Sequence, residues 1–336
     1  MPGPNVPFPP MEAELVRELP AGEGWQYEPK WDGFRGVLEN DGGELALWSR
    51  NERPLLRYFP ELAPLGELLP PHSALDGEIV ISREGVLDFD SMQMRLHPAE
   101  SRVRKLAAEI PAIFIAFDLL LWDGDPVHER PLEERRAELL RRGEGFWISP
   151  ATTSLDAAKA WLDRFEATGL DGVIAKRLGL AYMPGSREAV VKVKEHKTAD
   201  CVVIGVRWKS KPEKLATLLL GLYRDDGEVD YVGSAAIGAR NHDEIAARVL
   251  PLLDESNDRR FSEPNRWGTE GLEQTALRYE LVAEVRYDKV QGNRFRHGTK
   301  LIRFRDDKDP KQCTWREVRP PKRADDPTVE NLLERA

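Results

Sequence analysis

Residues 27–36 have the sequence YEPKWDGFRG and place a single lysine, Lys30, between two predicted β-strands. Asp32, Gly33 and Arg35 follow this lysine at fixed offsets. A lysine becomes a covalent nucleophile only after it loses its proton, which near neutral pH requires nearby cations or desolvation. The same residues are also typical of an exposed lysine beside an Asp-Gly turn. The stretch alone therefore leaves both interpretations open.

The rest of the first half has a mixed α and β pattern. Alternating apolar and polar residues predict strands at 25–27, 35–39 and 44–48, with a hairpin turn at 40–43. A strand at 74–82 is interrupted by a polar Asp-Gly-Glu, and a buried strand covers 112–121. Helical spacing predicts helices at 11–19, 58–69, 91–96, 99–110 and 132–142, and one from a Ser154 cap to Thr168.

The second half is mostly β. It contains predicted strands at 201–208, 217–224, 228–234, 280–287 and 300–305, and one helix at 242–253. This content suits a small Greek-key barrel such as an OB-fold, although an SH3-like barrel or a split sheet fits as well. The expected fold class is α+β, with a mixed α/β domain over residues 1–197, a β-barrel over 198–316 and a tail over 317–336.

Length and composition limit the class of protein. The chain has 336 residues, 41% of them hydrophobic and 32% charged, which is typical of about two globular domains. Its longest apolar stretch, 112–122, is too short to cross a bilayer, and the start lacks the pattern of an export signal. Cys201 and Cys313 match no zinc spacing. We therefore expect a cytoplasmic protein without a membrane segment.

Polar residues interrupt or follow several of the predicted strands, and these segments form an ordered series. With residues 27–36, they resemble in order and spacing the motifs of the covalent nucleotidyltransferase superfamily. The closest resemblance is to ATP-dependent DNA ligases, in particular the compact bacterial repair type. It extends over residues 25–315 and rests on SRN at 49–51, LDGE at 75–78, IAFD at 115–118, LDGVIAK at 170–176, VVKVK at 190–194 and RFRDDK at 303–308.

The resemblance implies that the first domain is an adenylation domain and that Lys30 attacks the α-phosphate of ATP. The lysyl-AMP would pass AMP to a DNA 5′-phosphate, and a 3′-hydroxyl would then seal the nick, as part of DNA repair. It also implies that Phe117 stacks on adenine and that Glu28 contacts the adenine edge through its backbone. Arg35, Arg50 and Arg187 would hold the ribose, the phosphates or the DNA 5′-phosphate.

The resemblance also implies roles for further charged residues. Lys192 and Lys194 point to the same face of one strand, where they would neutralise the α-phosphate and favour the neutral form of Lys30. Glu78 and Asp171 would hold Mg²⁺ or Mn²⁺. Asp171 departs from the family pattern, which usually has Glu there, and Val190 stands where an aromatic is common. In the barrel, Arg305, Asp307 and Lys308 would orient the pyrophosphate in the first step, which implies domain closure.

The net charge of −9 conceals two basic stretches, 176–214 and 286–323, that suit a DNA phosphate backbone or two ordinary solvated faces. The residues singled out for DNA binding are Lys209, Lys211, Arg294, Arg296 and Lys300. The expected partner is nicked duplex DNA, bound by a monomer associated with the nucleoid. A repair polymerase and an end-binding protein are candidate protein partners.

Three rival functions share parts of this pattern. An NAD⁺-dependent ligase needs a four-cysteine zinc site, which two cysteines cannot form. An RNA ligase or a capping guanylyltransferase has a similar lysine motif and differs in the nucleotide or the nick that it uses. A DNA-binding OB-fold protein without catalysis would lack the charged catalytic residues, yet each expected position carries a charge if Asp171 is counted as a conservative change.

Overall fold

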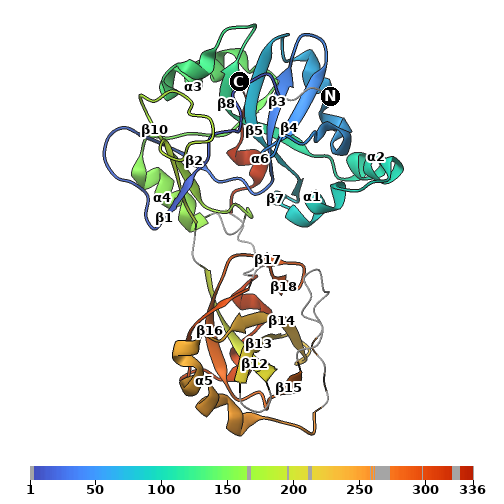
Figure 1. The fold of residues 1–336 in the computed structure, drawn as a ribbon, viewed down its shortest axis with the longest axis vertical. Helices are drawn as coiled ribbons and strands as arrows, with labels where there is room; N and C mark the ends of the chain where they lie inside the picture. Colours follow the sequence, from blue (N-terminus) through green and yellow to red (C-terminus); the bar gives the residue numbers. More distant parts are fainter. Residues whose placement is uncertain are drawn as a thin grey trace. The chain divides into compact units, whose positions relative to one another are not determined.

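The computed structural model describes residues 4–164, 168–194, 197–210, 214–257, 259, 261, 273–296, 298–319 and 326–335. The chain forms two compact units, Met1–Glu195 with Lys322–Ala336, and His196–Pro321 (Figure 1). The predicted tail at 317–336 is divided between them. Val318 packs into the core of the second unit, whereas Val329 packs into a core of the first. The first unit is therefore built from two separate parts of the sequence.

Two sheets and a short hairpin make up the β-structure in the described part of the first unit. A four-stranded sheet has the order β1-β11-β10-β2, and a six-stranded sheet has the order β20-β9-β8-β5-β3-β4. Most neighbours are antiparallel, but β1 is parallel to β11 and β8 to β9. The strands are β1 (Glu14–Val16), β2 (Trp25–Pro29), β3 (Phe34–Asn40), β4 (Leu45–Ser49), β5 (Ser73–Val80), β6 (Ser82–Arg83), β7 (Val86–Leu87), β8 (Ile113–Leu121), β9 (Trp147–Ile148), β10 (Val173–Arg177), β11 (Val190–Val193) and β20 (Glu334–Arg335).

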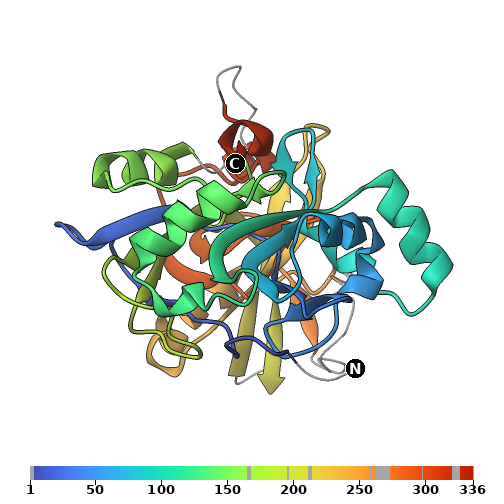
Figure 2. The same cartoon turned by 90° about the horizontal axis from the view of Figure 1, so that it is seen from above.

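Successive residues of a strand point to opposite faces of its sheet, so one strand can contribute to two apolar cores. On β8, Phe114 and Ala116 join one apolar core, whereas Ile115 joins another with Ala158 of α4 and Val329 of α6. Helix α2 lies at the periphery of the unit (Figures 1 and 2). The helices are α1 (Phe89–Arg95), α2 (Glu100–Glu109), α3 (Leu132–Arg142), α4 (Leu155–Arg164) and α6 (Val329–Leu332), with 3-10 turns at Leu56–Tyr58, Pro60–Glu67 and Val127–Glu129.

Two helix predictions in this unit need correction. Residues 11–19 form no helix, and β1 runs through them because Glu14, Leu15 and Val16 pair with β11. Residues 58–69 form mainly a 3-10 helix instead of an α-helix, and Pro60 and Pro64 within it remove backbone donors. The predicted cap at Ser154 is confirmed, since its hydroxyl accepts a bond from Ala157 N.

The described residues of the second unit form a mostly antiparallel sheet with one α-helix. Its six-stranded sheet has the order β14-β13-β12-β16-β19, and β15 pairs with the far part of the long strand β12. Cys201 and Cys313 are both buried in the core of this unit and carry free thiols. The elements are β12 (Lys197–Ser210), β13 (Lys214–Tyr223), β14 (Val229–Ala236), α5 (His242–Val249), β15 (Gln274–Ala276), β16 (Val282–Tyr287), β17 (Val290–Gln291), β18 (Arg294–Phe295) and β19 (Lys300–Phe304), with 3-10 turns at Ala239–Asn241, Leu250–Leu252, Pro310–Gln312 and Trp315–Glu317.

The predicted closed barrel is not seen in the described strands of this sheet. The sheet has two ends, β14 and β19, and an isolated parallel bridge links Ala235 of β14 to Thr299, the residue before β19. Within the described ranges, no helix has the length and apolarity that a membrane span requires.

Candidate active site

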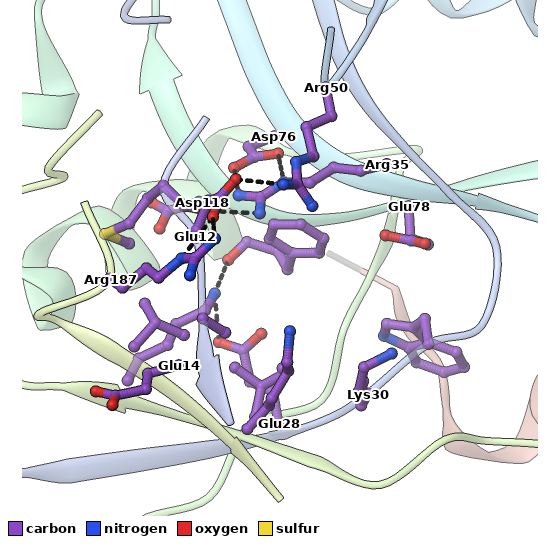
Figure 3. Close-up of a pocket in the computed structure, with 18 of the residues that line it drawn as sticks. Glu12, Glu14, Glu28, Lys30, Arg35, Arg50, Asp76, Glu78, Asp118 and Arg187 are labelled. Atoms are coloured by element: carbon purple, nitrogen blue, oxygen red, sulfur yellow. Dashed lines mark hydrogen bonds and ion pairs between the residues drawn. The ribbon is translucent and has the colours of Figure 1, made fainter. Parts of the chain in front are cut away.

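A pocket of about 360 Å³ lies in the first unit and is lined by strands of both its sheets (Figure 3). Most of the polar residues predicted from the sequence meet here. The lining residues include Glu28, Lys30, Arg35, Arg50, Glu78, Phe117, Arg187 and Lys192, together with Met11, Glu12, Glu14, Asp76, Asp118, Lys176, Tyr182 and Val190. The pocket therefore brings together residues from six of the motif segments.

Strand alternation explains why the charged residues share one wall of this pocket. On β5, Asp76 and Glu78 point to the pocket, whereas Leu75 and Ile79 on either side of this pair join the apolar core. Arg35 on β3 lies directly opposite Glu78 in the register. The polar interruption of the predicted strand is thus the pocket-facing side of a continuous β-strand.

Lys30 lies in the turn after β2, and the chain near Asp171 holds that turn. Lys30 N donates to Gly172 O at 2.9 Å, and Asp171 N donates to Lys30 O at 3.0 Å. The side chains also meet: Lys30 Nζ is 2.7 Å and Lys194 Nζ 2.9 Å from Asp171 Oδ2. Burial alone would raise the pKa of Asp171, but the two lysines lower it below its usual value. Lys30 must therefore lose a proton before its nitrogen can attack another atom, and it can do so with one N–H still donated to Asp171.

The glycines of the two Asp-Gly pairs are required by close backbone contacts. A Cβ on Gly33 would stand 2.0 Å from Ile79 O, and a Cβ on Gly172 would stand 2.0 Å from Val193 O. Gly172 also has a φ of +135°, which favours glycine. These glycines let the Lys30 turn approach β5, which carries Glu78, and the end of β11, which Lys194 follows.

Phe117 stands among cations at the inner end of the pocket. The Arg35 guanidinium lies 5.3 Å and Lys176 Nζ 4.8 Å from its ring centroid. Lys176 Nζ also donates to Phe117 O and pairs with Glu28 Oε1, each at 2.8 Å. Gln26 donates to the same Glu28 oxygen at 2.8 Å. The side chain of Glu28 is therefore engaged within the protein, while its backbone remains on β2.

Arg35 is fixed by a group of residues that the sequence did not identify as site residues. Its guanidinium donates twice to Asp76, at 3.0 and 2.5 Å, and once to Met11 O at 2.5 Å. The Tyr182 hydroxyl donates to Asp76 at 2.7 Å and accepts from Met11 N at 2.9 Å. Burial opposes the charged guanidinium, but Asp76 outweighs this cost and raises the pKa of Arg35. Asp76 was visible in the LDGE motif, whereas Tyr182 carried no local signal.

Arg50 and Arg187 lie at the outer side of the pocket and share one carboxylate, Glu12. Arg50 is 2.6 Å from Glu12 Oε1, and Arg187 Nε donates to Glu12 Oε2 at 2.7 Å. Lys192 faces the same region, and burial together with Lys30 and Lys194 lowers its pKa. Three cations from different segments therefore surround one acidic side chain.

Glu78 is the half-buried carboxylate of the pocket that best fits a metal ion. Its Oε1 accepts a bond from Gly33 N at 3.2 Å. Burial raises its pKa to about 7, although Lys30 and Arg35 oppose the shift. The negative charge of Glu78 is thus incompletely balanced by the protein, which suits a cation. Asp171, in contrast, is already paired with two lysines, and no cluster of three potential ligands occurs in the described ranges.

In the second unit, Arg305, Asp307 and Lys308 form one ionic network. Arg305 donates two bonds of 2.8 Å to Asp307 and one of 3.1 Å to Asp200. Lys308 Nζ lies 2.9 Å from Asp200 and 2.5 Å from Glu317. The hydrogen bonds from Arg305 lower the pKa of Asp307 to about 2. This network joins the predicted motif to the beginning of β12.

The residues singled out for DNA binding occupy three places in the second unit. Lys209 on β12 and Lys300 on β19 are exposed. Arg294 and Arg296 are half-buried, with the Arg294 guanidinium 5.1 Å from the Tyr231 ring centroid. Lys211 lies outside the described residues. Their role in DNA binding stays a prediction.

Comparison with known proteins identifies the family of the chain. The family model for the ATP-dependent DNA ligase domain matches residues 10–194. The chain is 44% identical to DNA ligase C2 of Mycolicibacterium smegmatis, covering 94% of this chain and 95% of that one. It is 42% identical to DNA ligase C of Mycobacterium tuberculosis, covering 94% of each. A solved Lig E DNA ligase is similar in fold, with a TM-score of 0.53, 16% identity and coverage of 88% of this chain and 100% of that one. The chain belongs to the ATP-dependent DNA ligases.

Proposed function

We propose that Lys30 is the nucleophile of this ligase and carries AMP between ATP and DNA. In the first step a bond forms between Lys30 Nζ and the α-phosphorus of ATP, the bond to pyrophosphate breaks, and the lysine proton passes to solvent. The observation that carries this proposal is the position of Lys30 in a pocket with Arg35, Lys192 and Phe117. Such cations stabilise the charge that develops on the phosphates during transfer.

The adenosine would occupy the inner end of the pocket. Phe117 offers a ring for stacking on adenine, and Arg35 is held in one orientation by Asp76, which suits a hydrogen bond to the ribose. Because the Glu28 carboxylate already accepts bonds from Lys176 and Gln26, its backbone is the group left to contact the adenine edge.

Lys192 and Lys194 would contact the α-phosphate, and Arg50 and Arg187 would hold phosphate oxygens further out. Glu78 would be the protein ligand of Mg²⁺ or Mn²⁺, with phosphate oxygens and water completing its coordination, as is usual for Mg²⁺ at nucleotide sites. When bound, the metal would neutralise phosphate charge. Asp171 would reach the metal only after its lysine partners turn to the nucleotide.

We further propose that the second unit is an OB-fold that binds nicked duplex DNA. Three observations support it: β12 pairs with both β13 and β16, one helix follows β14, and a parallel bridge joins residues at the two ends of the sheet. The exposed Lys209 and Lys300 suit phosphate contacts. We place the enzyme in DNA repair in the cytoplasm, as a monomer at the nucleoid, with a polymerase or end-binding protein as candidate partner.

The test of this function is covalent labelling followed by nick sealing. We expect the protein to retain label from [α-³²P]ATP on a denaturing gel, but not from labelled GTP or NAD⁺. It should then seal a nicked DNA duplex faster than the same nick in RNA. Labelling by GTP would indicate a capping enzyme, and faster sealing of RNA would indicate an RNA ligase.

A further inference from the structure

The segment Met11–Glu14 forms one wall of the pocket, and its backbone is held on both sides. Met11 N donates to the Tyr182 hydroxyl at 2.9 Å, while Met11 O accepts a bond from Arg35. Glu12 N donates to Ser186 O at 2.8 Å. Glu14 begins β1, which pairs with β11. This anchored backbone directs the Glu12 side chain at the outer part of the pocket.

The Glu12 carboxylate uses one oxygen for each of two arginines. Its Oε1 lies 2.6 Å from Arg50, and its Oε2 lies 2.7 and 2.5 Å from two nitrogens of Arg187 (Figure 3). The hydrogen bond from Arg187 lowers the pKa of Glu12, and the charges of Arg50 and Lys192 act in the same direction. Glu12 is therefore an ionised carboxylate within a cluster of three cations.

A carboxylate bound by two guanidinium groups resembles a phosphate group, because both anions accept hydrogen bonds from arginine in a planar fork. The arginine side chains are well exposed, at 59% for Arg50 and 63% for Arg187, whereas that of Glu12 is 21% exposed. Ion pairs with such exposure contribute little net stability and exchange readily. The same two arginines line the pocket that would receive ATP.

We propose that Glu12 is an internal counter-anion that holds Arg50 and Arg187 before substrate binds and gives way to an incoming phosphate group. The inference rests on the proposed role of these arginines in phosphate binding. It assigns to Glu12 a role in setting the affinity for phosphate: the incoming group must displace the carboxylate, so Glu12 weakens binding and limits capture of unrelated anions.

The variant Glu12→Gln tests this inference by the sign of its effect. We expect it to bind a phosphate ligand about three- to fivefold more tightly, because two exposed ion pairs no longer compete. The matched control is Glu14→Gln, which removes the same charge from the same pocket wall. The Glu14 carboxylate forms no ion pair with a residue in the described ranges.

Calorimetry on the full chain would use two pairs of probes that separate the source of the phosphate. The first pair is the α,β-methylene analogue of ATP, which cannot transfer AMP, and adenosine. The second is a nicked duplex with a 5′-phosphate or with a 5′-hydroxyl at the nick. Tighter binding of the analogue alone assigns the displaced site to nucleotide phosphates, and tighter binding of the 5′-phosphate nick alone assigns it to DNA. Tighter binding of both probes indicates that nucleotide phosphates and the DNA 5′-phosphate use the same site.

The inference is overturned if Glu12→Gln leaves both phosphate probes unchanged or weakens them, since Glu12 would then only support the arginines. It is also overturned if Glu14→Gln raises the affinity for the phosphate probes equally. The same holds if Glu12→Gln raises the affinity for adenosine and for the 5′-hydroxyl nick as much as for the phosphate probes. The variant Arg187→Ala separates this failure from that of the proposed function. If Arg187→Ala does not weaken either phosphate probe, the proposed role of the arginines is wrong.

Discussion

The pocket of the first unit and the Arg305–Lys308 network of the second hold their charges in different ways. In the pocket, Asp76 is fully buried and receives bonds from residues that are 41 and 106 positions away in the sequence. In the network, the Asp307 side chain is 67% exposed, and its arginine partner is two residues away. The difference indicates that Asp76 holds Arg35 in one orientation, whereas Asp307 can exchange partners.

Replacement of Lys30 gives the largest expected effect and tests whether the pocket is the chemical centre. We expect both Lys30→Ala and Lys30→Arg to abolish covalent labelling by ATP, because neither supplies an amine nucleophile. Lys30→Arg keeps a cation for Asp171, so its melting temperature should stay near that of the unmodified enzyme. Sealing of a pre-adenylated nick should survive better than sealing from ATP. Labelling of Lys30→Ala would disprove the assignment.

Asp76→Ala should show how firmly the pocket depends on its buried carboxylate. It leaves Arg35 without its ion-pair partner and the Tyr182 hydroxyl without its acceptor. We expect a loss of about 3 kcal/mol in the free energy of unfolding, measured by denaturant titration. Asp307→Ala in the second unit is the matched comparison and should change stability very little. Equal losses would remove the distinction between the two regions.

Asp118→Asn tests, through the pH dependence of stability, how much a second buried carboxylate contributes to the first unit. Burial alone would raise the pKa of Asp118, but Arg135, which donates bonds of 2.7 and 3.0 Å to it, outweighs this effect and lowers the pKa. A carboxyl group with a lowered folded-state pKa adds stability above its unfolded pKa of about 3.9 and loses it as pH falls through the folded value. The variant should therefore be about 3 kcal/mol less stable at pH 7, with the gap closing below about pH 4. A gap that stays constant down to about pH 2 would contradict this.

Asp307→Ala and Lys308→Ala should affect one reaction step instead of the whole enzyme. We expect about tenfold slower formation of the enzyme adenylate, because the family resemblance gives these residues a role in orienting pyrophosphate. Closure of a pre-adenylated nick should change less than adenylation, as measured by single-turnover sealing. If both steps slow equally, the network has a general role and its contrast with the pocket disappears.

The combined variant Lys209→Glu, Lys211→Glu should have the smallest effect and concerns DNA binding alone. We expect weaker binding of nicked DNA and a log–log salt dependence flatter by about 0.9 for each phosphate that the protein no longer neutralises. Covalent labelling by ATP should not change, since these residues have no catalytic counterpart. An unchanged salt slope would move the proposed DNA-binding surface to Arg294, Arg296 and Lys300.

The sequence predicted the pocket residues where local motifs carried the signal, and it failed where the partner was distant. Lys30, Arg35, Glu78 and Lys192 were all predicted from their motifs and do line one pocket. Tyr182 was not, because its contact with Asp76 depends on how the two sheets meet. Glu12 was missed for the same reason, since Arg50 and Arg187 reach it from two separate loops.

The secondary structure was likewise predicted where the signal was local and missed where it depended on distant pairing. The predicted strands correspond to β2, β3, β4, β5 and β8 of the first unit and to β12, β13, β14, β16 and β19 of the second, because alternation is a local property of the sequence. Residues 11–19 were wrongly predicted as a helix, because their pairing with β11 brings together segments more than 170 residues apart. The short strand β15 was also missed, since three residues carry too little periodicity to be recognised.

The two buried cysteines give this ligase a built-in probe of local opening. Burial raises the pKa of Cys201 well above its usual value and that of Cys313 to about 12, so neither thiol reacts readily while the fold is closed. Both lie in the second unit, and the chain has no other cysteine. The rate of thiol alkylation therefore reports how often the second unit opens and gives no information on opening of the first unit. A mass spectrometer could follow the stability of one unit inside the intact enzyme without any introduced label.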